Sequence, residues 1–71
     1  MYQSATVIWF DILKGIGEAK SNKNGKTIFI NAAFSFKNTS DCFKLKEGVS
    51  IFCKTNKSKE GNLFSTNLKL V

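Results

Sequence analysis

The chain has 71 residues, 42% of them apolar, and a formal net charge of +6 that comes from eleven Lys, no Arg and five acidic residues. This length predicts a single domain over residues 1–71 with a small core, because so short a chain buries only about 60% of its unfolded surface. Neither a large active-site cavity nor intrinsic disorder fits this composition. Since no membrane helix or signal peptide is evident, we expect a cytoplasmic protein without membrane contact.

The first half of the chain predicts three β-strands. Runs rich in Val, Ile, Phe and Thr cover residues 5–10, 16–20 and 27–34. Between the second and third runs lies a polar segment that contains Asn24 and Gly25. An Asn-Gly pair between two such runs is the strongest short-range hairpin signal, so we expect these two strands to be antiparallel neighbours.

Alternation of side chains predicts which residues of these strands share a face. In the third run Ile28 and Ile30 share one face, while Phe29 and Asn31 share the other. In the first run, apolar residues occupy both the odd and the even positions, so alternation does not decide whether Trp9 faces the core or the solvent. The third strand therefore has a predicted core side, and the first does not.

The second half predicts two further strands after a long connection at residues 35–48, which we expect to cross one end of a barrel. The fourth run covers 49–55, and a loop at 56–62 with Lys and Gly separates it from the fifth. Five strands in a three-plus-two grouping favour an all-β fold that closes into a small barrel.

The same alternation assigns faces in the last two strands. In the fourth run it places Val49, Ile51 and Cys53 in the core and leaves Phe52 outside. In the fifth run it predicts one face of four residues against an opposite face of three. The first comprises Phe64, Thr66, Leu68 and Leu70, and the second comprises Ser65, Asn67 and Lys69.

Few groups in this sequence suit catalysis or metal binding. There is no His, the five acids form no obvious pair, and neither Cys has an imidazole partner. The segment 14–17 (K-G-I-G) lacks the second half of a phosphate loop. Cys42 and Cys53 do not make a zinc site without His, and we expect both to be free thiols. The sequence thus predicts no enzyme, no catalytic residue, no metal and no cofactor.

Aromatic and basic side chains on strands remain. Single-stranded nucleic acid is held by rings that stack on bases, each stack being worth about 1–3 kcal/mol, and by Lys beside the phosphates. The candidate rings are Trp9 and Phe29, followed by Phe10 and Phe52. The candidate lysines are Lys14, Lys26, Lys54 and Lys57. The competing interpretation is that most Phe residues in so small a chain fill the core.

Several motifs in the order of the chain resemble the cold-shock domain family over essentially the full length. They are V-I-W-F-D at 7–11, K-G-I-G at 14–17, I-F-I-N at 28–31, L-K-E-G at 45–48 and T-N-L at 66–68. The resemblance implies a five-stranded antiparallel closed barrel of the oligonucleotide-binding type. It also implies that single-stranded RNA or DNA lies across the first three strands.

The resemblance carries over four residues of the family's binding face. Trp9 and Phe29 match stacking positions, and Phe10 and Lys14 match their neighbours. Other positions depart from the family pattern. Four of them replace rings: Ile16 and Glu18 stand where the family has aromatic residues, Asn31 where it has His, and Ala32 where it has Phe. Two more, Ile8 and Asp11, stand where the family has Lys and Asn.

These departures predict weak binding. Losing two to four stacks removes roughly 2–4 kcal/mol, which weakens binding roughly 30- to 1000-fold. Glu18 also puts a negative charge where a base would lie. Asn31 can still hydrogen-bond a base edge, and Lys26 and Lys54 can contact phosphates. We therefore expect a monomer that binds single-stranded RNA or DNA weakly, with strong salt sensitivity and little sequence selectivity.

The alternative is a protein-interaction module on the same barrel that has lost nucleic-acid binding. Ile8, Ile16 and Phe52 could extend an apolar patch. On a small monomer such a patch often marks a surface for a protein partner.

Overall fold

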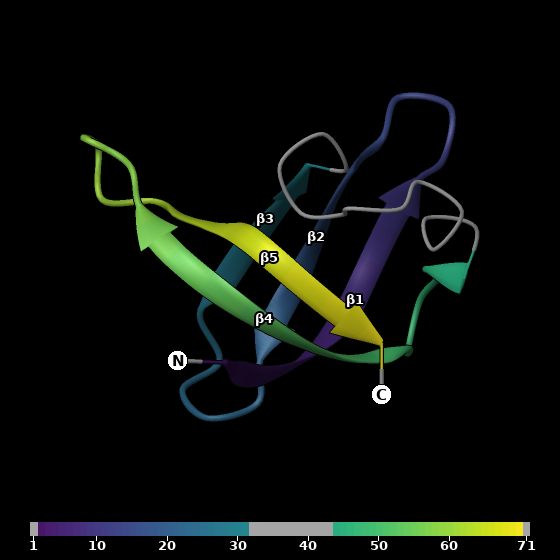
Figure 1. Cartoon of the computed structure of the whole chain (residues 1–71), viewed down its shortest axis with the longest axis horizontal. Coiled ribbons are helices and arrows are strands. Elements are labelled where there is room, and N and C mark those ends of the chain that lie inside the picture. Colours follow the sequence, from purple (N-terminus) through teal and green to yellow (C-terminus); the bar gives the residue numbers. More distant parts are fainter. Residues whose placement is uncertain (1, 32–43, 71) are drawn as a thin grey trace.

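The computed structural model describes residues 2–31 and 44–70, and the five predicted runs are strands in these ranges (Figure 1). The part of the third run beyond residue 31, and most of the long connection at 35–48, lie outside the described residues. The strands are β1 (Gln3–Asp11), β2 (Ile16–Ser21), β3 (Thr27–Asn31), β4 (Ser50–Lys57) and β5 (Leu63–Leu70).

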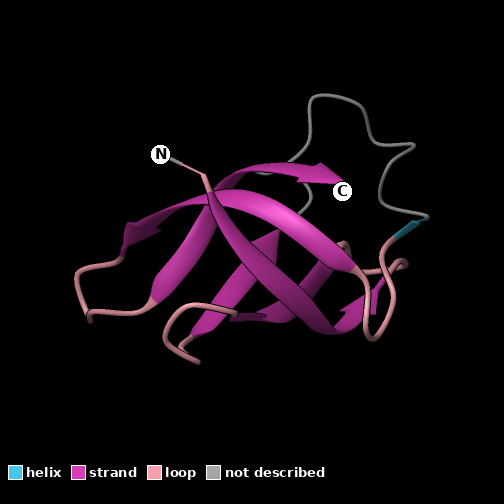
Figure 2. Ribbon diagram, turned by 90° about the horizontal axis from the view of Figure 1, so that it is seen from below, coloured by secondary structure: helices cyan, strands magenta, loops and turns pink. Residues whose placement is uncertain are grey.

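The strands close into a barrel in the order β1-β2-β3-β5-β4, with β4 pairing back onto β1 (Figure 2). The predicted all-β, five-stranded closed barrel is therefore confirmed. The expectation that it is antiparallel throughout is corrected at one place, since β3 and β5 run parallel. The reason is parity: in a ring with an odd number of strands, at least one neighbouring pair has to run in the same direction.

The β2–β3 connection confirms the hairpin that Asn24 and Gly25 predict. Gly25 has a φ of 73°, which glycine adopts without steric cost. Its backbone N–H donates to the carbonyl of Ser21 at 2.9 Å, and the Asn24 side-chain oxygen accepts from the Lys26 N–H at 3.0 Å. The turn thus satisfies its own polar groups and sets the register of β2 against β3.

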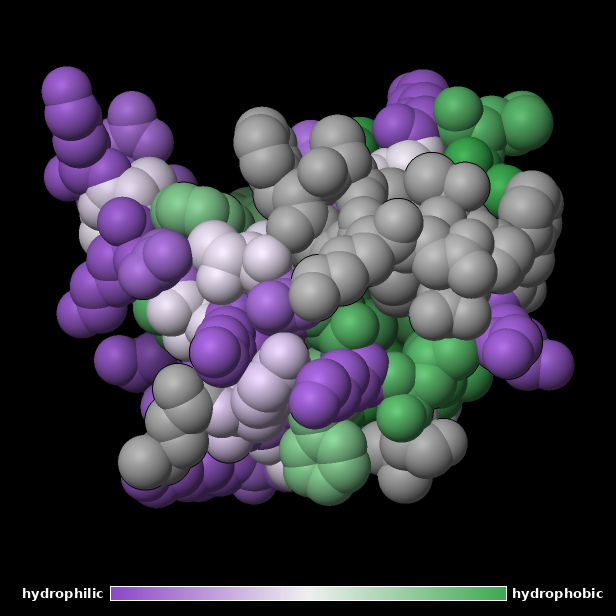
Figure 3. Space-filling model, viewed as in Figure 1, coloured by the Kyte–Doolittle hydropathy of each residue, from purple (hydrophilic) through white to green (hydrophobic). Residues whose placement is uncertain are grey.

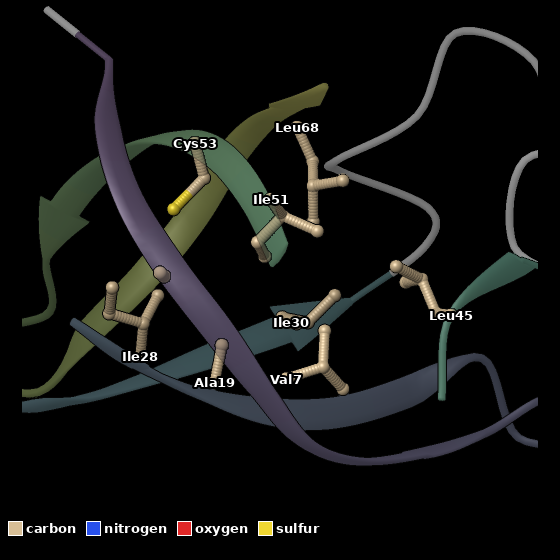
Figure 4. Close-up of a cluster of buried hydrophobic side chains, with 9 residues drawn as sticks. Val7, Ala19, Ile28, Ile30, Leu45, Ile51, Cys53 and Leu68 are labelled. Carbon is tan, nitrogen blue, oxygen red and sulfur yellow. The ribbon is translucent and has the colours of Figure 1, made fainter. Parts of the chain in front are cut away.

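Small and branched side chains fill the inside of the barrel (Figure 4). Each large aliphatic side chain buried there contributes about 1.5–3 kcal/mol. The alternation predicted for β3 and β4 is confirmed, with Cys53 buried and Phe52 and Phe29 exposed. The buried hydrophobic residues are Ala5, Val7, Ala19, Ile28, Ile30, Leu45, Ile51, Cys53 and Leu68.

The alternation predicted for β5 is confirmed for Leu68, which is buried, and for Lys69, which is exposed, but it fails before them. Ser65, which is 1% exposed, faces the core together with Leu68, although the prediction put these two residues on opposite faces. Consecutive residues of β4 pair with Asn67 and Ser65, so Thr66 is an extra residue in the ladder. Such a bulge inverts the faces on either side of it, which is why both Ser65 and Leu68 point inward.

Candidate nucleic-acid interface

A row of side chains crosses the outer face of β1, β2 and β3. Trp9 pairs with Glu18, Glu18 pairs with Phe29, and Phe29 pairs with Phe64 of β5. Directly paired residues lie on the same face of a sheet with their Cβ atoms about 4.5–5.5 Å apart. We call Trp9, Glu18, Phe29 and Phe64 the aromatic row. It brings together the two rings that sequence reasoning placed first, Trp9 and Phe29, and they are 41% and 44% exposed.

A bulge in β1 turns Trp9 outward. Val7 pairs with Ala19 while Trp9 pairs with the preceding β2 residue, Glu18, so Ile8 is an extra residue between them. Val7 is buried, and uninterrupted alternation would put Trp9 in the core beside it. The additional residue instead moves Trp9 to the outer face, which resolves the question that the sequence pattern leaves open.

Gly17 supports the row from beneath. A Cβ atom at this position would lie 2.4 Å from the backbone oxygen of Trp9 and 2.7 Å from Cδ1 of Phe10. The absence of a side chain lets Phe10 pack over Gly17 against the core. The structure therefore places Phe10 under the aromatic row rather than within it.

A hydrogen bond links the charge and the first ring of the row. The indole Nε1–H of Trp9 donates to Oε2 of Glu18 at 2.7 Å. Hydrogen bonds to a carboxylate are short and roughly twice as strong as neutral ones. This contact holds the indole in one orientation and fixes a carboxylate between the Trp9 and Phe29 rings.

A second row lies beside the first on the same outer face. Ile16 pairs with Asp11 on one side and with Asn31 on the other, and both Ile16 and Asn31 are exposed. The Asp11 carboxylate accepts from the backbone N–H groups of Leu13 and Lys14 at 3.0 and 3.2 Å. Asp11 thus stabilises the start of the β1–β2 loop and fixes the backbone position of Lys14 within it.

The lysines divide between two sides of the barrel. Lys14 lies in the β1–β2 loop, Lys26 in the β2–β3 turn, and Lys20 on the outer face of β2 between them. Lys54 lies elsewhere, with its Nζ 5.2 Å from the centre of the Tyr2 ring. The predicted residues Lys14 and Lys26 thus stand at opposite ends of the row face, whereas Lys54 belongs to the β4–β5 side.

Sequence reasoning missed an apolar loop tip next to this face. Leu13 is 98% exposed and Ile12 is also exposed. Figure 3 shows hydrophobic surface at the β1–β2 loop, at upper right, and hydrophilic surface over the β4–β5 hairpin tip, at upper left. The Ile-Leu pair between Asp11 and Lys14 is the sequence signal that could have identified it. Phe52, by contrast, pairs with Ser4 and lies toward the other end of β1 from Trp9.

The described part of the chain contains few other groups that could react or bind a metal ion. Cys53 is a buried free thiol, and burial raises its pKa above the ordinary value of 9.0. Cys42 lies outside the described residues. Residues 2–31 and 44–70 contain no cluster of three or more His, Cys, Asp or Glu that could hold a metal ion. In the same residues, no helix has the length and hydropathy needed to cross a membrane.

No family model matches this chain, and no curated protein matches it significantly.

Proposed function

We propose that this protein binds single-stranded RNA or DNA through the aromatic row and the lysines around it, and that it is a binding protein rather than an enzyme. The observation that carries the proposal is the cross-strand alignment of Trp9 and Phe29, both half-exposed, on the outer face of a three-stranded sheet. Rings in this arrangement are what successive unpaired bases stack on. Three of the sequence motifs that resemble cold-shock domains, at 7–11, 14–17 and 28–31, lie on or beside the same three strands and support the same function.

The charges on this face support weak, salt-dependent binding. The net charge of +6 favours encounters with polyanions. If Lys14, Lys20 and Lys26 each neutralise one phosphate, the logarithm of the affinity falls with the logarithm of salt with a slope of about −2. Affinity then drops about 20-fold between 50 and 200 mM salt. Stacking adds little base selectivity of its own, because every base has a π face.

The direct test is a titration of the fluorescence of Trp9, the only tryptophan, with eight-base oligo-dT and oligo-U at low and physiological salt. We expect quenching that saturates and weakens with salt. With labelled strands and an anisotropy readout, Trp9→Ala and Phe29→Ala should each weaken binding about 5- to 150-fold.

Phe52→Ala is the matched control, because Phe52 is exposed to a similar extent, 42%, but lies on β4. We expect it to change affinity less than twofold. Parental affinity in both Trp9→Ala and Phe29→Ala, with the barrel folded, would rule out the aromatic row as the binding site.

We propose a protein-interaction surface as the second candidate function, on the single observation that Leu13 and Ile12 expose an apolar loop tip. Apolar surface of this kind on a small domain often contacts a protein. Leu13→Ser should then reduce capture of a protein partner while leaving oligonucleotide affinity unchanged. A strictly monomeric protein that recovers no partner from its own cell lysate would count against this candidate.

A further inference from the structure

Glu18 is an unusual residue to find at the centre of a stacking surface. It pairs directly with Trp9 on one side and with Phe29 on the other, so Glu18 lies between two residues with exposed rings. Its Oε2 atom accepts from the indole of Trp9 at 2.7 Å. Within the described residues, Oε1 has no hydrogen-bond partner and no lysine forms an ion pair with Glu18. The row therefore presents a fixed acceptor that no side chain of residues 2–31 and 44–70 neutralises.

The position of this acceptor matches the edge of a stacked base. A base that lies on the Phe29 ring occupies space above β3, and its neighbour in the row is only about 5 Å away. The edge that this base turns toward β2 then meets the Glu18 carboxylate. Stacking itself tolerates any base, so the group at the edge decides which base fits.

An ionised carboxylate accepts hydrogen bonds and donates none. Guanine presents two adjacent donors, N1–H and N2–H, that can bind both carboxylate oxygens at once. Uracil and thymine present a single N3–H between two carbonyl acceptors. Adenine and cytosine each present one amino group beside an acceptor ring nitrogen. Guanine is therefore the base that gains most from this carboxylate, while every other base turns a lone pair toward it.

We infer that the aromatic row selects guanine in single-stranded nucleic acid, with Glu18 as the residue that determines this specificity. The inference rests on the proposed function and sharpens it, because it adds one selective contact to otherwise tolerant stacking. A two-bond contact to a base edge typically discriminates by about 1–3 kcal/mol. We expect about a tenfold preference, since Oε2 already carries the Trp9 hydrogen bond.

The test compares three labelled strands of equal length by anisotropy at low salt. They are eight thymines, the same strand with one central guanine, and the same strand with hypoxanthine in place of that guanine. The guanine strand should bind about tenfold more tightly than the thymine strand. Hypoxanthine lacks the 2-amino group, so it should retain about a threefold advantage at most.

The decisive variant is Glu18→Gln, which keeps an oxygen acceptor for the Trp9 indole but loses the charge. Its preference for guanine should fall below about twofold, and its affinity for the thymine strand should hold or rise. Glu18→Ala provides a second variant that adds no amide donor and should show the same loss. Glu60→Gln removes an equal charge from the exposed β4–β5 loop and should keep the full preference.

The outcomes separate this inference from the proposed function. One outcome is that the parent protein binds all three strands equally and that Phe29→Ala weakens this binding. That result would overturn guanine selectivity and leave nucleic-acid binding intact. A preference that survives in Glu18→Gln and Glu18→Ala would likewise overturn the role of Glu18. Failure of every strand to bind the parent protein would overturn both.

Discussion

The barrel has two outer faces that carry aromatic rings, and the charges beside the rings differ in sign. In the aromatic row the Trp9 indole is held at its edge by a carboxylate. On the other side, which we call the β4–β5 face (Tyr2, Phe52, Lys54 and Lys69), the Tyr2 ring lies within 5.2 and 4.6 Å of two lysine ammonium groups. Cations at this distance interact favourably with the face of a ring.

The difference shows that exposure of a ring does not by itself make a stacking site. A base that approaches Tyr2 has to displace ammonium groups that already interact with the ring. A base that approaches Phe29 or Trp9 meets rings whose neighbouring charge lies at the edge. Under the proposed function, the two lysines that contact Tyr2 add positive charge to the molecule but occupy the ring face that a base would need.

The largest expected effect comes from Ile51→Ala. This substitution should lower the free energy of unfolding of the whole barrel and so affect both faces equally. Ile51 is fully buried in the core that both faces share. The substitution should cost about 2–5 kcal/mol, a large part of the roughly 4–10 kcal/mol expected for a domain of this size. Urea unfolding measures the loss, and Ile51→Val should cost about 0.5–1.5 kcal/mol. An unchanged urea midpoint in Ile51→Ala would contradict the assigned core.

Gly17→Ala should damage one face and spare the other. The new methyl group would meet the Trp9 carbonyl and the Phe10 ring, at a cost of about 1–3 kcal/mol in unfolding free energy. We expect a shifted Trp9 emission spectrum and weaker oligonucleotide binding. Gly61→Ala is the control, because nothing lies within 4 Å of its Cβ and only its φ of 87° resists the change. A stable Gly17→Ala variant with parental emission would show that the close approach is not required.

Alkaline pH tests the core beneath the β4–β5 face. Burial raises the pKa of the Cys53 thiol, so above pH 9.0 the unfolded chain loses a proton that the folded chain keeps. The free energy of unfolding should therefore fall as pH rises, by up to about 1.4 kcal/mol per unit from this thiol, until the folded thiol also ionises. Cys53→Ala lacks this contribution. Identical pH dependence of the two proteins in urea unfolding between pH 8 and 11 would refute the assignment.

Tyr2→Ala should have the smallest effect and sharpens the comparison most directly. Loss of the exposed contacts with Lys54 and Lys69 should cost about 0.5–1 kcal/mol in urea unfolding, while Tyr2→Phe keeps the ring and should cost less. Oligonucleotide affinity should not change in either variant. If Tyr2→Ala weakened binding as much as Phe29→Ala does, the β4–β5 face would belong to the interface and the distinction between the two faces would fail.

Sequence alone could predict the parts of this fold in which alternation is unbroken. Ile28 and Ile30 of β3, and Cys53 and Phe52 of β4, lie on the sides that alternation assigns to them. The Asn-Gly hairpin is equally local, because its turn residues hydrogen-bond within the turn. In these segments the sequence pattern and the tertiary structure agree because each residue has one partner in the ladder.

The predictions failed or stayed open at the two bulges. The extra residues in β1 and β5, Ile8 and Thr66, invert the faces that follow them. Their positions depend on how two strands pair, which the residues of one strand do not encode. For the same reason the sequence indicated only that Glu18 replaces a ring of the family pattern. Its hydrogen bond to Trp9 depends on the pairing of β1 with β2, which the structure shows. The contact between Lys54 and the Tyr2 ring is likewise a tertiary contact that the sequence pattern does not reveal.

The parallel contact between β3 and β5 has a consequence for the order in which the molecule folds. It joins Ile28 to Leu63 and Phe29 to Phe64, pairs that are far apart in the chain. The β1–β2–β3 meander and the β4–β5 hairpin can form from local contacts, whereas the β1–β4 and β3–β5 contacts each cost the entropy of bringing distant parts of the chain together. The β3–β5 seam offsets this cost with two residue pairs and the β1–β4 contact with four, so we expect the meander and the hairpin to form early and this seam to close last. Phe64 therefore joins the other rings only in the final step, and amide hydrogen exchange should open this seam before any other.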